Sequence, residues 1–328
     1  MTTLVTGGLG FIGRALVEAL SASGHSVRVF DNQARSHTRR APTFGPEVEL
    51  RFGDVRDLAF VRRCMEGVDR VFHLAALNGT RNFYERPREV LEVGLLGTHN
   101  VVSAALDAEV SELLFMSSSE VYQTPPVLPT PETVSLVVPD VHNPRYSYGG
   151  GKIAGELICA NYGREGFERL VMVRPHNVYG PDMGDAHVIP ELAAKIAAAR
   201  RMPIPRTVSL QGGGETTRAF VHVEDFVRGC LLALEKGEHL GIYHVGSRDE
   251  IRILELAKEI ADILDIDVTF TSSPAPAGQT PRRCPDISKI EALGFSPRIG
   301  LRSGLEDAVG AWREPQKGNS HEHLSRTA

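Results

Sequence analysis

The sequence predicts an α/β fold in which helices cover both faces of a parallel β-sheet. Short β-branched runs alternate with longer helical patterns through the first half of the chain, which is typical of repeated strand-helix-strand units. Several strands are nearly continuous apolar runs, as expected for strands buried on both faces. The 328 residues, 42% of them hydrophobic, are enough for one large or two coupled domains.

The elements follow in order along the chain. Apolar runs predict strands over 3–6, 26–30, 48–52, 70–74, 113–116 and 170–173. Helical periodicity between them predicts helices over 11–21, 58–65, 88–106 and 148–162. After residue 175 the chain becomes rich in proline and glycine, with further helices predicted over 190–200, 251–264 and 304–312.

These patterns divide the chain into two predicted domains and a tail. The first domain comprises residues 1–175, and 215–240 returns to it as a strand and a helix. A smaller C-terminal α/β domain comprises 176–214 and 241–313. Residues 314–328 are polar and aperiodic, which predicts disorder.

Composition excludes several classes of protein. The 41 acidic and 36 basic side chains give a net charge of −5, and no dense basic run occurs, so we expect no nucleic-acid partner. The four cysteines form no C-x-x-C pair, which predicts neither a metal site nor a disulfide framework. There is no leader pattern and no apolar run of membrane-spanning length. We therefore expect a cytoplasmic protein that does not associate with a membrane.

A glycine-rich turn follows the first predicted strand and opens the first helix. Gly7, Gly10 and Gly13 have the spacing G-x-x-G-x-x-G, with Phe11 and Ile12 between the last two. Free backbone N–H groups and the helix dipole favour a diphosphate here, provided that no Cβ blocks its approach. The turn therefore predicts a dinucleotide cofactor.

The second predicted strand ends in an acidic residue suited to a ribose. Asp31 lies 18 residues after Gly13, where its carboxylate can accept hydrogen bonds from both ribose hydroxyls and would repel a 2′-phosphate. This favours NAD over NADP, although three nearby arginines leave NADP open: Arg35, Arg39 and Arg40. Asp54, after the third strand, is expected either to contact the adenine or to cap the next helix, a role for which Asp57 competes.

A tyrosine and a lysine begin the helix predicted over 148–162. Tyr148 and Lys152 are four residues apart and so share one helix face. Tyrosine is a poor base at neutral pH, and a neighbouring ammonium group stabilises its phenolate. Ser117, Ser118 and Glu120 follow the fifth strand, at the sheet edge where a doubly wound fold presents its functional groups.

With these motifs, the sequence resembles the extended short-chain dehydrogenase/reductase superfamily, specifically the NAD-dependent epimerases and dehydratases of nucleotide sugars. The resemblance covers about residues 2–313 and implies a Rossmann first domain. It rests on residues 6–13, 31, 53–55, 73–76, 97–98, 117–122, 148–152, 174–181, 218–225 and 282–289.

The resemblance implies NAD as cofactor, a nucleoside diphosphate sugar as substrate, and a homodimer formed through the helices that begin near Arg88 and Tyr148. Tyr148 would take a proton from a sugar hydroxyl, Lys152 would assist it, and Ser118 would hydrogen-bond the reacting oxygen. The expected cofactor contacts are Gly7, Gly10, Phe11, Ile12, Gly13, Asp31, Asn32, Asp54, Val55, Leu74, Ala75, Ala76, Ser117, Tyr148, Lys152 and Pro175. The expected substrate contacts are Thr80, Arg81, Asn177, His187, Val188, Arg218 and one of the pair Arg282 and Arg283.

The reaction depends on Glu120. Simple 4-epimerisation through a 4-keto sugar needs no carboxylate base beyond Tyr148, and it is our leading hypothesis. The alternative is a 4,6-dehydratase or a decarboxylase that uses Glu120 as base, although Ser119 stands where such dehydratases carry an aspartate and residues 175–178 depart from the usual decarboxylase sequence. A non-catalytic NAD-binding regulator is a third hypothesis, against which Ser118, Tyr148 and Lys152 argue.

Overall fold

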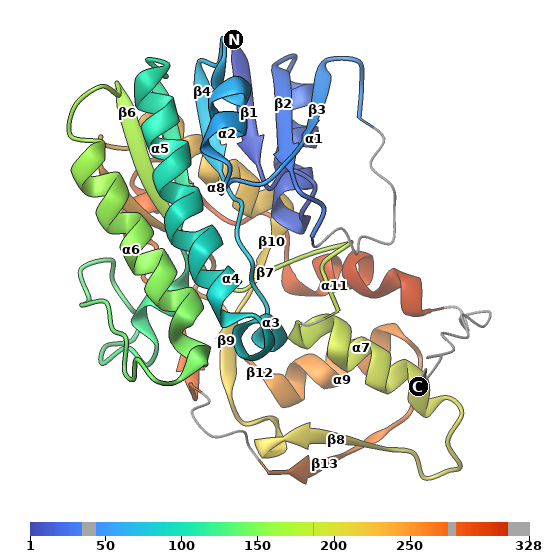
Figure 1. Ribbon diagram of the computed structural model, residues 1–328. Helices are drawn as coiled ribbons and strands as arrows, with labels where there is room; N and C mark the ends of the chain where they lie inside the picture. Colours follow the sequence, from blue (N-terminus) through green and yellow to red (C-terminus); the bar gives the residue numbers. More distant parts are fainter. Residues whose placement is uncertain (35–43, 186, 275–279, 314–328) are drawn as a thin grey trace, which may run out of the picture.

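The predicted parallel sheet is confirmed by the computed structural model, which describes residues 1–34, 44–185, 187–274 and 280–313. Seven parallel strands form one sheet in the order β3-β2-β1-β4-β5-β6-β11 (Figure 1). The order reverses between β1 and β4, and ligands bind in the crevice at the carboxyl ends of the strands at such a point. The strands are β1 (Thr2–Thr6), β2 (Ser26–Asp31), β3 (Val48–Phe52), β4 (Arg70–His73), β5 (Glu112–Met116), β6 (Arg169–Pro175) and β11 (Gly241–Val245).

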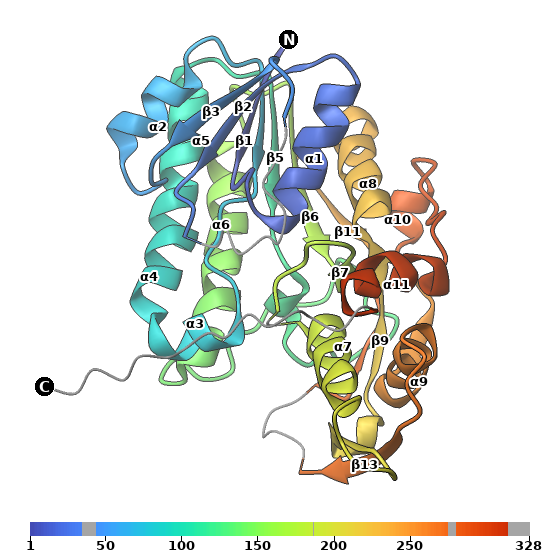
Figure 2. The same ribbon diagram turned by 90° about the vertical axis from the view of Figure 1, so that its right-hand side faces the viewer.

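Helices cover both faces of this sheet, as Figure 2 shows. One face packs against α1 (Phe11–Ala22), α8 (Val223–Lys236) and α10 (Ser288–Glu291). The other packs against α2 (Leu58–Met65), α5 (Thr98–Asp107) and α6 (Ser147–Tyr162). The helix predicted over 88–106 contains a π-helical stretch and consists of α4 (Pro87–Glu92), η1 (Val93–Gly97) and α5; the short α3 (Thr80–Glu85) precedes it.

A smaller group of elements lies beyond the carboxyl edge of the sheet and has its own apolar core (Figure 1). Its helices are α7 (Val188–Ala199), α9 (Ile253–Ile263) and α11 (Leu301–Val309). Its strands are β8 (Thr207–Gln211) with β13 (Thr269–Ser273), and β9 (Thr217–Ala219) between β12 (Glu250–Arg252) and β14 (Arg282–Arg283). The short remaining elements are β7 (Val178–Tyr179), β10 (Val221–His222), η2 (Ser119–Tyr122), η3 (Pro144–Tyr146), η4 (Gly212–Gly214) and η5 (Gly310–Trp312).

One predicted boundary needs correction. We expected residues 241–313 to belong to the second domain, but β11 pairs in parallel with β6 and completes the large sheet. A parallel neighbour must be reached through a crossover, and α8 is the helix that makes it. α10 also packs on this part of the molecule. The rest of the predicted division stays a prediction, and the tail over 314–328 lies outside the described residues.

Candidate functional site

The glycine-rich turn is held so tightly that side chains would not fit. Gly7 has φ +72°, and a Cβ on it would lie 2.8 Å from the backbone nitrogen of Ala75. A Cβ on Gly13 would lie 2.1 Å from the Gly7 carbonyl oxygen. Gly10 precedes α1 and provides no side-chain cap, so the turn presents backbone N–H groups at a helix N-terminus. This cradle fits a diphosphate.

Asp31 lies beside this turn at the end of β2. Its carboxylate accepts hydrogen bonds from the N–H groups of Leu9 (3.0 Å) and Gln33 (2.7 Å). These bonds fix the carboxylate where the second strand meets the turn, as a ribose contact requires. The three arginines that left NADP open, Arg35, Arg39 and Arg40, lie outside the described residues.

Of the two roles considered for Asp54, adenine contact and helix capping, the structure assigns the capping role to Asp57 instead. Asp57, not Asp54, caps α2 by accepting from the Phe60 N–H. Asp54 instead binds the Arg56 guanidinium at 2.8 and 2.9 Å, and these hydrogen bonds lower its pKa to about 2. Asn32 donates to the same carboxylate at 3.2 Å. The expected adenine contact of Asp54 therefore involves a carboxylate already oriented by two neighbours.

The predicted catalytic pair lies on α6, and its lysine contacts the end of β5. Tyr148 is 9% exposed and stacks on Phe83, with ring centroids 5.3 Å apart. Lys152 is 3% exposed, donates to the Met116 carbonyl at 2.6 Å, and lies 5.8 Å from the Tyr148 ring centroid. Burial lowers the pKa of Lys152 to about 8. A cation is thus held next to Tyr148 at considerable energetic cost, as a functional group would be.

The serines after β5 point in different directions. Ser118 begins η2, and its Oγ accepts from the Glu120 N–H at 3.2 Å. The Ser117 hydroxyl donates to Glu156, which lies one turn beyond Lys152 on α6. Glu156 in turn forms a buried ion pair with Arg174 at 2.6 Å. The hydroxyl proton of Ser117 is therefore committed to this network, and the expected cofactor contact of Ser117 gains no support from it.

Glu120 forms an ion pair with Arg283 at 2.5 Å, joining residues 163 positions apart. Burial alone would raise the pKa of Glu120, but the Arg283 guanidinium, with Arg145 and Arg218 behind it, outweighs burial and lowers that pKa. The carboxylate is therefore ionised at neutral pH. Three arginines surround one carboxylate here, which leaves excess positive charge for an anionic substrate.

The two adjacent arginines of β14 point their side chains in opposite directions and bind different carboxylates. Arg282 forms a two-pronged ion pair with Glu250, and its side chain is half-exposed. Arg283 points the other way, towards Glu120, and its side chain is 12% exposed. Neighbouring strand residues face opposite sides of a sheet, so only one of them can reach the cleft. Arg283 therefore lies beside Glu120 and Arg282 lies on the surface, and the substrate contact of either one stays a prediction.

Arg218 is partly buried and forms no ion pair with a carboxylate among the described residues. It donates to the carbonyl oxygens of Thr217 (2.6 Å) and Thr280 (2.9 Å). Burial, with Arg283 nearby, lowers its pKa to about 10, so it remains charged at neutral pH. A partly buried guanidinium that is held by carbonyl groups is suited to a phosphate.

The other expected substrate contacts are less decisive. Arg81 is exposed on α3 and pairs with Glu85 at 2.8 Å, as an ordinary surface side chain does, and Thr80 is also exposed. Asn177 has φ +41° and donates to the Ala219 carbonyl at 2.9 Å. His187 precedes α7 and Val188 begins it, so both lie at a helix N-terminus. Their substrate contacts stay predictions.

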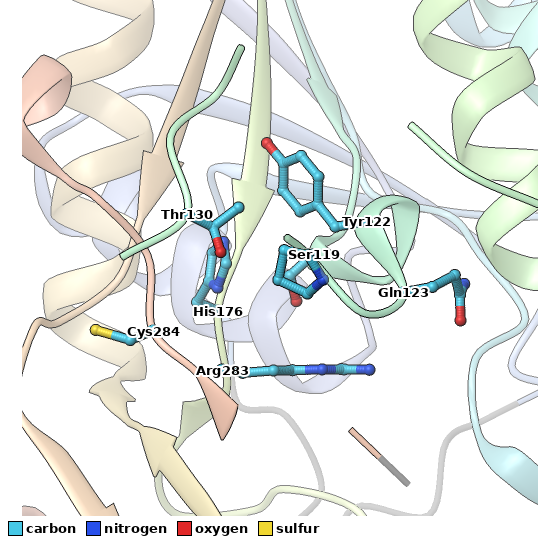
Figure 3. Close-up of a pocket in the computed structure, with 8 residues that line it drawn as sticks. Ser119, Tyr122, Gln123, Thr130, His176, Arg283 and Cys284 are labelled. Carbon is cyan, nitrogen blue, oxygen red and sulfur yellow. The ribbon is translucent and has the colours of Figure 1, made fainter. Parts of the chain in front are cut away.

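Arg145, near Glu120, was missed by the sequence, although its place three positions before Tyr148 is a usable signal. Two other residues attract attention in the sequence: Gln123 stands where the family carries a glycine, and His176 is a candidate either for the lining of a sugar or base pocket or for a structural role. Gln123 and His176 line a small pocket with Arg283 (Figure 3). Its walls are Ser119, Tyr122, Gln123, Pro125, Thr130, His176, Arg283 and Cys284.

Comparisons with known proteins agree with this geometry. A sequence model of the NAD dependent epimerase/dehydratase family matches residues 3–246. The chain is 32% identical to UDP-glucuronic acid decarboxylase 2 of Arabidopsis thaliana over its full length and 72% of the relative's length. It is 31% identical to a dTDP-4-dehydro-6-deoxy-D-allose reductase from a Streptomyces species, with 95% of this chain and 96% of that protein covered.

A solved structure is similar over nearly the whole chain. The UDP-glucose 4-epimerase of Thermotoga maritima, in complex with UDP-glucose, has a TM-score of 0.83 and 26% identity, with 95% of this chain and 99% of that chain covered. Within the described residues, no helix has the length and apolar character needed to cross a membrane. Cofactor cradle, catalytic pair and comparisons agree: the chain belongs to the NAD-dependent epimerase/dehydratase family, and NAD is its cofactor.

Proposed function

We propose that the protein is a nucleotide-sugar decarboxylase: it oxidises C4 of a nucleoside diphosphate uronic acid and releases the C6 carboxylate as carbon dioxide. The observation that carries this proposal is the Glu120–Arg283 ion pair beside Ser118. Epimerisation at C4 changes no bond at C5 or C6 and has no use for two further charged groups. Decarboxylation can use both groups, Arg283 to bind the C6 carboxylate and Glu120 to orient Arg283.

The first step uses Ser118, Tyr148 and Lys152. Tyr148 takes the proton of the C4 hydroxyl, and the Lys152 ammonium stabilises the resulting negative charge. Ser118 donates to the oxygen that becomes the ketone. When bound, NAD supplies the acceptor for the C4 hydride and can return it at the end of the cycle. Arg218 holds the diphosphate, so that the sugar lies with C4 at the catalytic pair.

The C4 ketone prepares the second step. A carboxylate on the carbon next to a ketone leaves as carbon dioxide, because the electron pair that it leaves behind becomes an enolate. Tyr148, now carrying the proton, and Ser118 both hydrogen-bond that enolate. Arg283 binds the uronate carboxylate, while Glu120 orients Arg283 and partly neutralises it, so the carboxylate is not held too firmly to leave. C5 then takes a proton from solvent.

Dehydration fits the same residues less well. Loss of the C6 hydroxyl group needs an acid to protonate it. Glu120 is ionised because of Arg283, and Ser119 stands beside it in place of a carboxylic acid. Carbon dioxide leaves without a proton and needs no such acid. The name of the Arabidopsis relative, UDP-glucuronic acid decarboxylase 2, agrees with the proposal.

The experiment is incubation of the NAD-loaded protein with UDP-glucuronic acid in deuterated water. We expect release of carbon dioxide and a UDP-pentose that carries deuterium at C5 by NMR. Tyr148→Phe is the control and should bind NAD without turnover. A UDP-uronic acid inverted at C4, without deuterium at C5 and without carbon dioxide, would contradict the proposal.

A 4-epimerase is the second candidate, and it was favoured by the sequence. The observation in its favour is the close similarity to a UDP-glucose 4-epimerase over 95% of the chain. Under this hypothesis the Glu120–Arg283 pair only shapes the sugar site. UDP-glucose would then be converted to its 4-epimer, and Glu120→Gln would change the rate little.

We also propose that the protein forms a homodimer through α4, η1, α5 and α6. These helices pack side by side on one face of the molecule (Figure 1) and expose apolar side chains to solvent. A cluster of such side chains is typical of a protein interface. The exposed apolar side chains on these helices include Leu91, Leu95, Leu96, Leu157 and Tyr162, each 40–60% exposed.

A further inference from the structure

The small pocket beside Arg283 is lined by residues whose polar atoms include some that the proposed reaction does not use. His176 lies in its wall and is 3% exposed, and neither ring nitrogen has a hydrogen-bond partner among the described residues. The Nε of Arg283 is also buried, and it has no hydrogen-bond partner within the part of the chain that the structure describes. Figure 3 shows both side chains on the same pocket. Unpaired buried polar atoms are rare, so their occurrence on two residues that line the same pocket indicates a missing partner.

The neighbours of His176 do not supply that partner. The His244 ring packs edge-to-face on it, with centroids 4.7 Å apart. His244 is itself satisfied, because its Nδ1 contacts the Asp286 carbonyl at 3.0 Å and its Nε2 contacts the Tyr122 hydroxyl at 2.7 Å. The carbonyl can only accept, so His244 carries its proton on Nδ1.

His176 is neutral in this setting. Burial, together with His244 and the guanidinium groups of Arg283 and Arg174, holds its pKa well below the ordinary value. A neutral imidazole has one N–H donor and one nitrogen that accepts. The two ring nitrogens point away from each other, so one small group can meet the Nε–H donor of Arg283 and one nitrogen of His176, which either donates or accepts.

Only one class of group matches this arrangement. A carboxylate or phosphate group is too large for this pocket, which has room for about one water-sized group, while an ammonium group donates only and is repelled by Arg283. A hydroxyl-type oxygen accepts and donates at once. We propose that the pocket is a subsite for one hydroxyl-type oxygen, bound between His176 and Nε of Arg283, which holds Arg283 in place against Glu120.

The pocket is small, so that oxygen belongs either to a water molecule or to one hydroxyl group of the sugar. Crystal structures of the NAD-bound protein, with and without UDP-glucose, distinguish the two sources. We expect an oxygen within about 3.2 Å of both a His176 nitrogen and Nε of Arg283. An oxygen present without UDP-glucose is water, and one present only with it is a sugar hydroxyl. Absence of any oxygen there in both structures would overturn the proposal.

Two variants measure what the oxygen contributes. His176→Phe keeps a flat ring and removes both nitrogens, whereas His176→Gln keeps one donor and one acceptor. If water fills the site, His176→Phe should lower the melting temperature and His176→Gln should largely restore it. If a sugar hydroxyl fills it, His176→Phe should weaken UDP-glucose binding by about tenfold, as expected for one lost hydrogen bond, with UDP binding unchanged.

A matched double mutant tests the link to Arg283. Arg283→Lys keeps the cation but removes Nε, so His176→Phe should have a smaller effect in that background than in the wild type. A His176→Phe protein that is as stable as the wild type and binds UDP-glucose equally well would show that His176 only packs. These readouts measure stability and binding, so they stand whether or not the protein decarboxylates a uronic acid.

Discussion

Arg282 and Arg283 are neighbours in sequence, yet they meet entirely different surroundings. Arg282 pairs with Glu250 in solvent, while Arg283 pairs with Glu120 in the cleft. We predict that Arg283→Ala lowers kcat/KM for the nucleotide sugar about thirtyfold or more, because it removes a buried charge partner and leaves Glu120 unpaired.

Arg282→Ala is the matched control and should change kcat/KM less than about threefold, since an exposed ion pair contributes little. Steady-state kinetics with both variants provide the measurement. Equal losses of kcat/KM from the two substitutions would contradict the assignment of Arg283, and not Arg282, to the substrate site.

Lys152 illustrates a conflict between stability and function. Its pKa is about 8 in the folded protein and near 10.5 in the unfolded chain, so the protonated amine destabilises the fold by about 3 kcal/mol. This penalty is fully present below pH 8 and disappears as the pH rises to 10.5, where the amine is neutral in both states. The wild type should therefore gain stability with pH across that window.

We predict that Lys152→Met, with NAD removed, is about 1–2 kcal/mol more stable than the wild type at pH 7, since losing the bond to Met116 offsets part of the gain. Turnover should fall at least about a hundredfold. Urea denaturation at pH 7 and pH 10 checks the first expectation, and the gain should shrink at the higher pH. A less stable variant at pH 7 would contradict the assigned burial cost.

At the scale of elements, α6 carries three consecutive glycines between its two catalytic residues. A Cβ on Gly149 would lie 2.8 Å from the Gln123 amide nitrogen and 3.0 Å from the Glu120 carbonyl oxygen. A Cβ on Gly151 would lie 3.7 Å from Cα of Gly94 in η1. The first glycine lets η2, and with it Glu120, approach the catalytic helix. The helix bears the entropic cost of glycine for this contact.

Gly150 differs from its neighbours, because a Cβ there would meet only a Val138 methyl group at 3.6 Å. We predict that Gly150→Ala raises the free energy of unfolding by about 0.5–1 kcal/mol and preserves activity. Gly149→Ala should instead lower both stability and kcat, because it displaces the Glu120 backbone. Chemical denaturation and kinetics of the two variants check this, and a stabilising Gly149→Ala would refute the account of close approach.

At the scale of the whole molecule, the exposed apolar face of α4, η1, α5 and α6 predicts self-association. Leu157→Arg, at a side chain that is 60% exposed on α6, should convert a dimer into a monomer, because a buried unpaired charge costs several kcal/mol. Ile204→Arg, at a side chain that is 81% exposed elsewhere, is the control and should leave the dimer intact. Light scattering after gel filtration measures the mass. A monomeric wild type, or a Leu157→Arg dimer, would refute this interface.

Much of the fold and the cofactor site was predictable because their signals are local. The turn at Gly7–Gly13 and the carboxylate of Asp31 depend on spacing along a strand-helix-strand unit, and apolar runs identified most of the sheet. The strand over 241–245 was assigned to the wrong part of the molecule, because its apolar run does not say which strand it joins.

The parallel sheet, the dinucleotide cradle and the spacing of Tyr148 and Lys152 could be predicted without a structure, since each depends on residues close together in the chain. Which arginine faces Glu120, and that His176 shares a pocket with Arg283, became known from the folded arrangement alone. These contacts depend on folding because β14 lies more than 160 residues after β5 in the chain, and Arg283 reaches Glu120 only when the two are packed together. Glu120 and Arg283 come into contact only in the folded chain. In our proposal this ion pair decides which reaction follows the oxidation step at Tyr148 and Lys152.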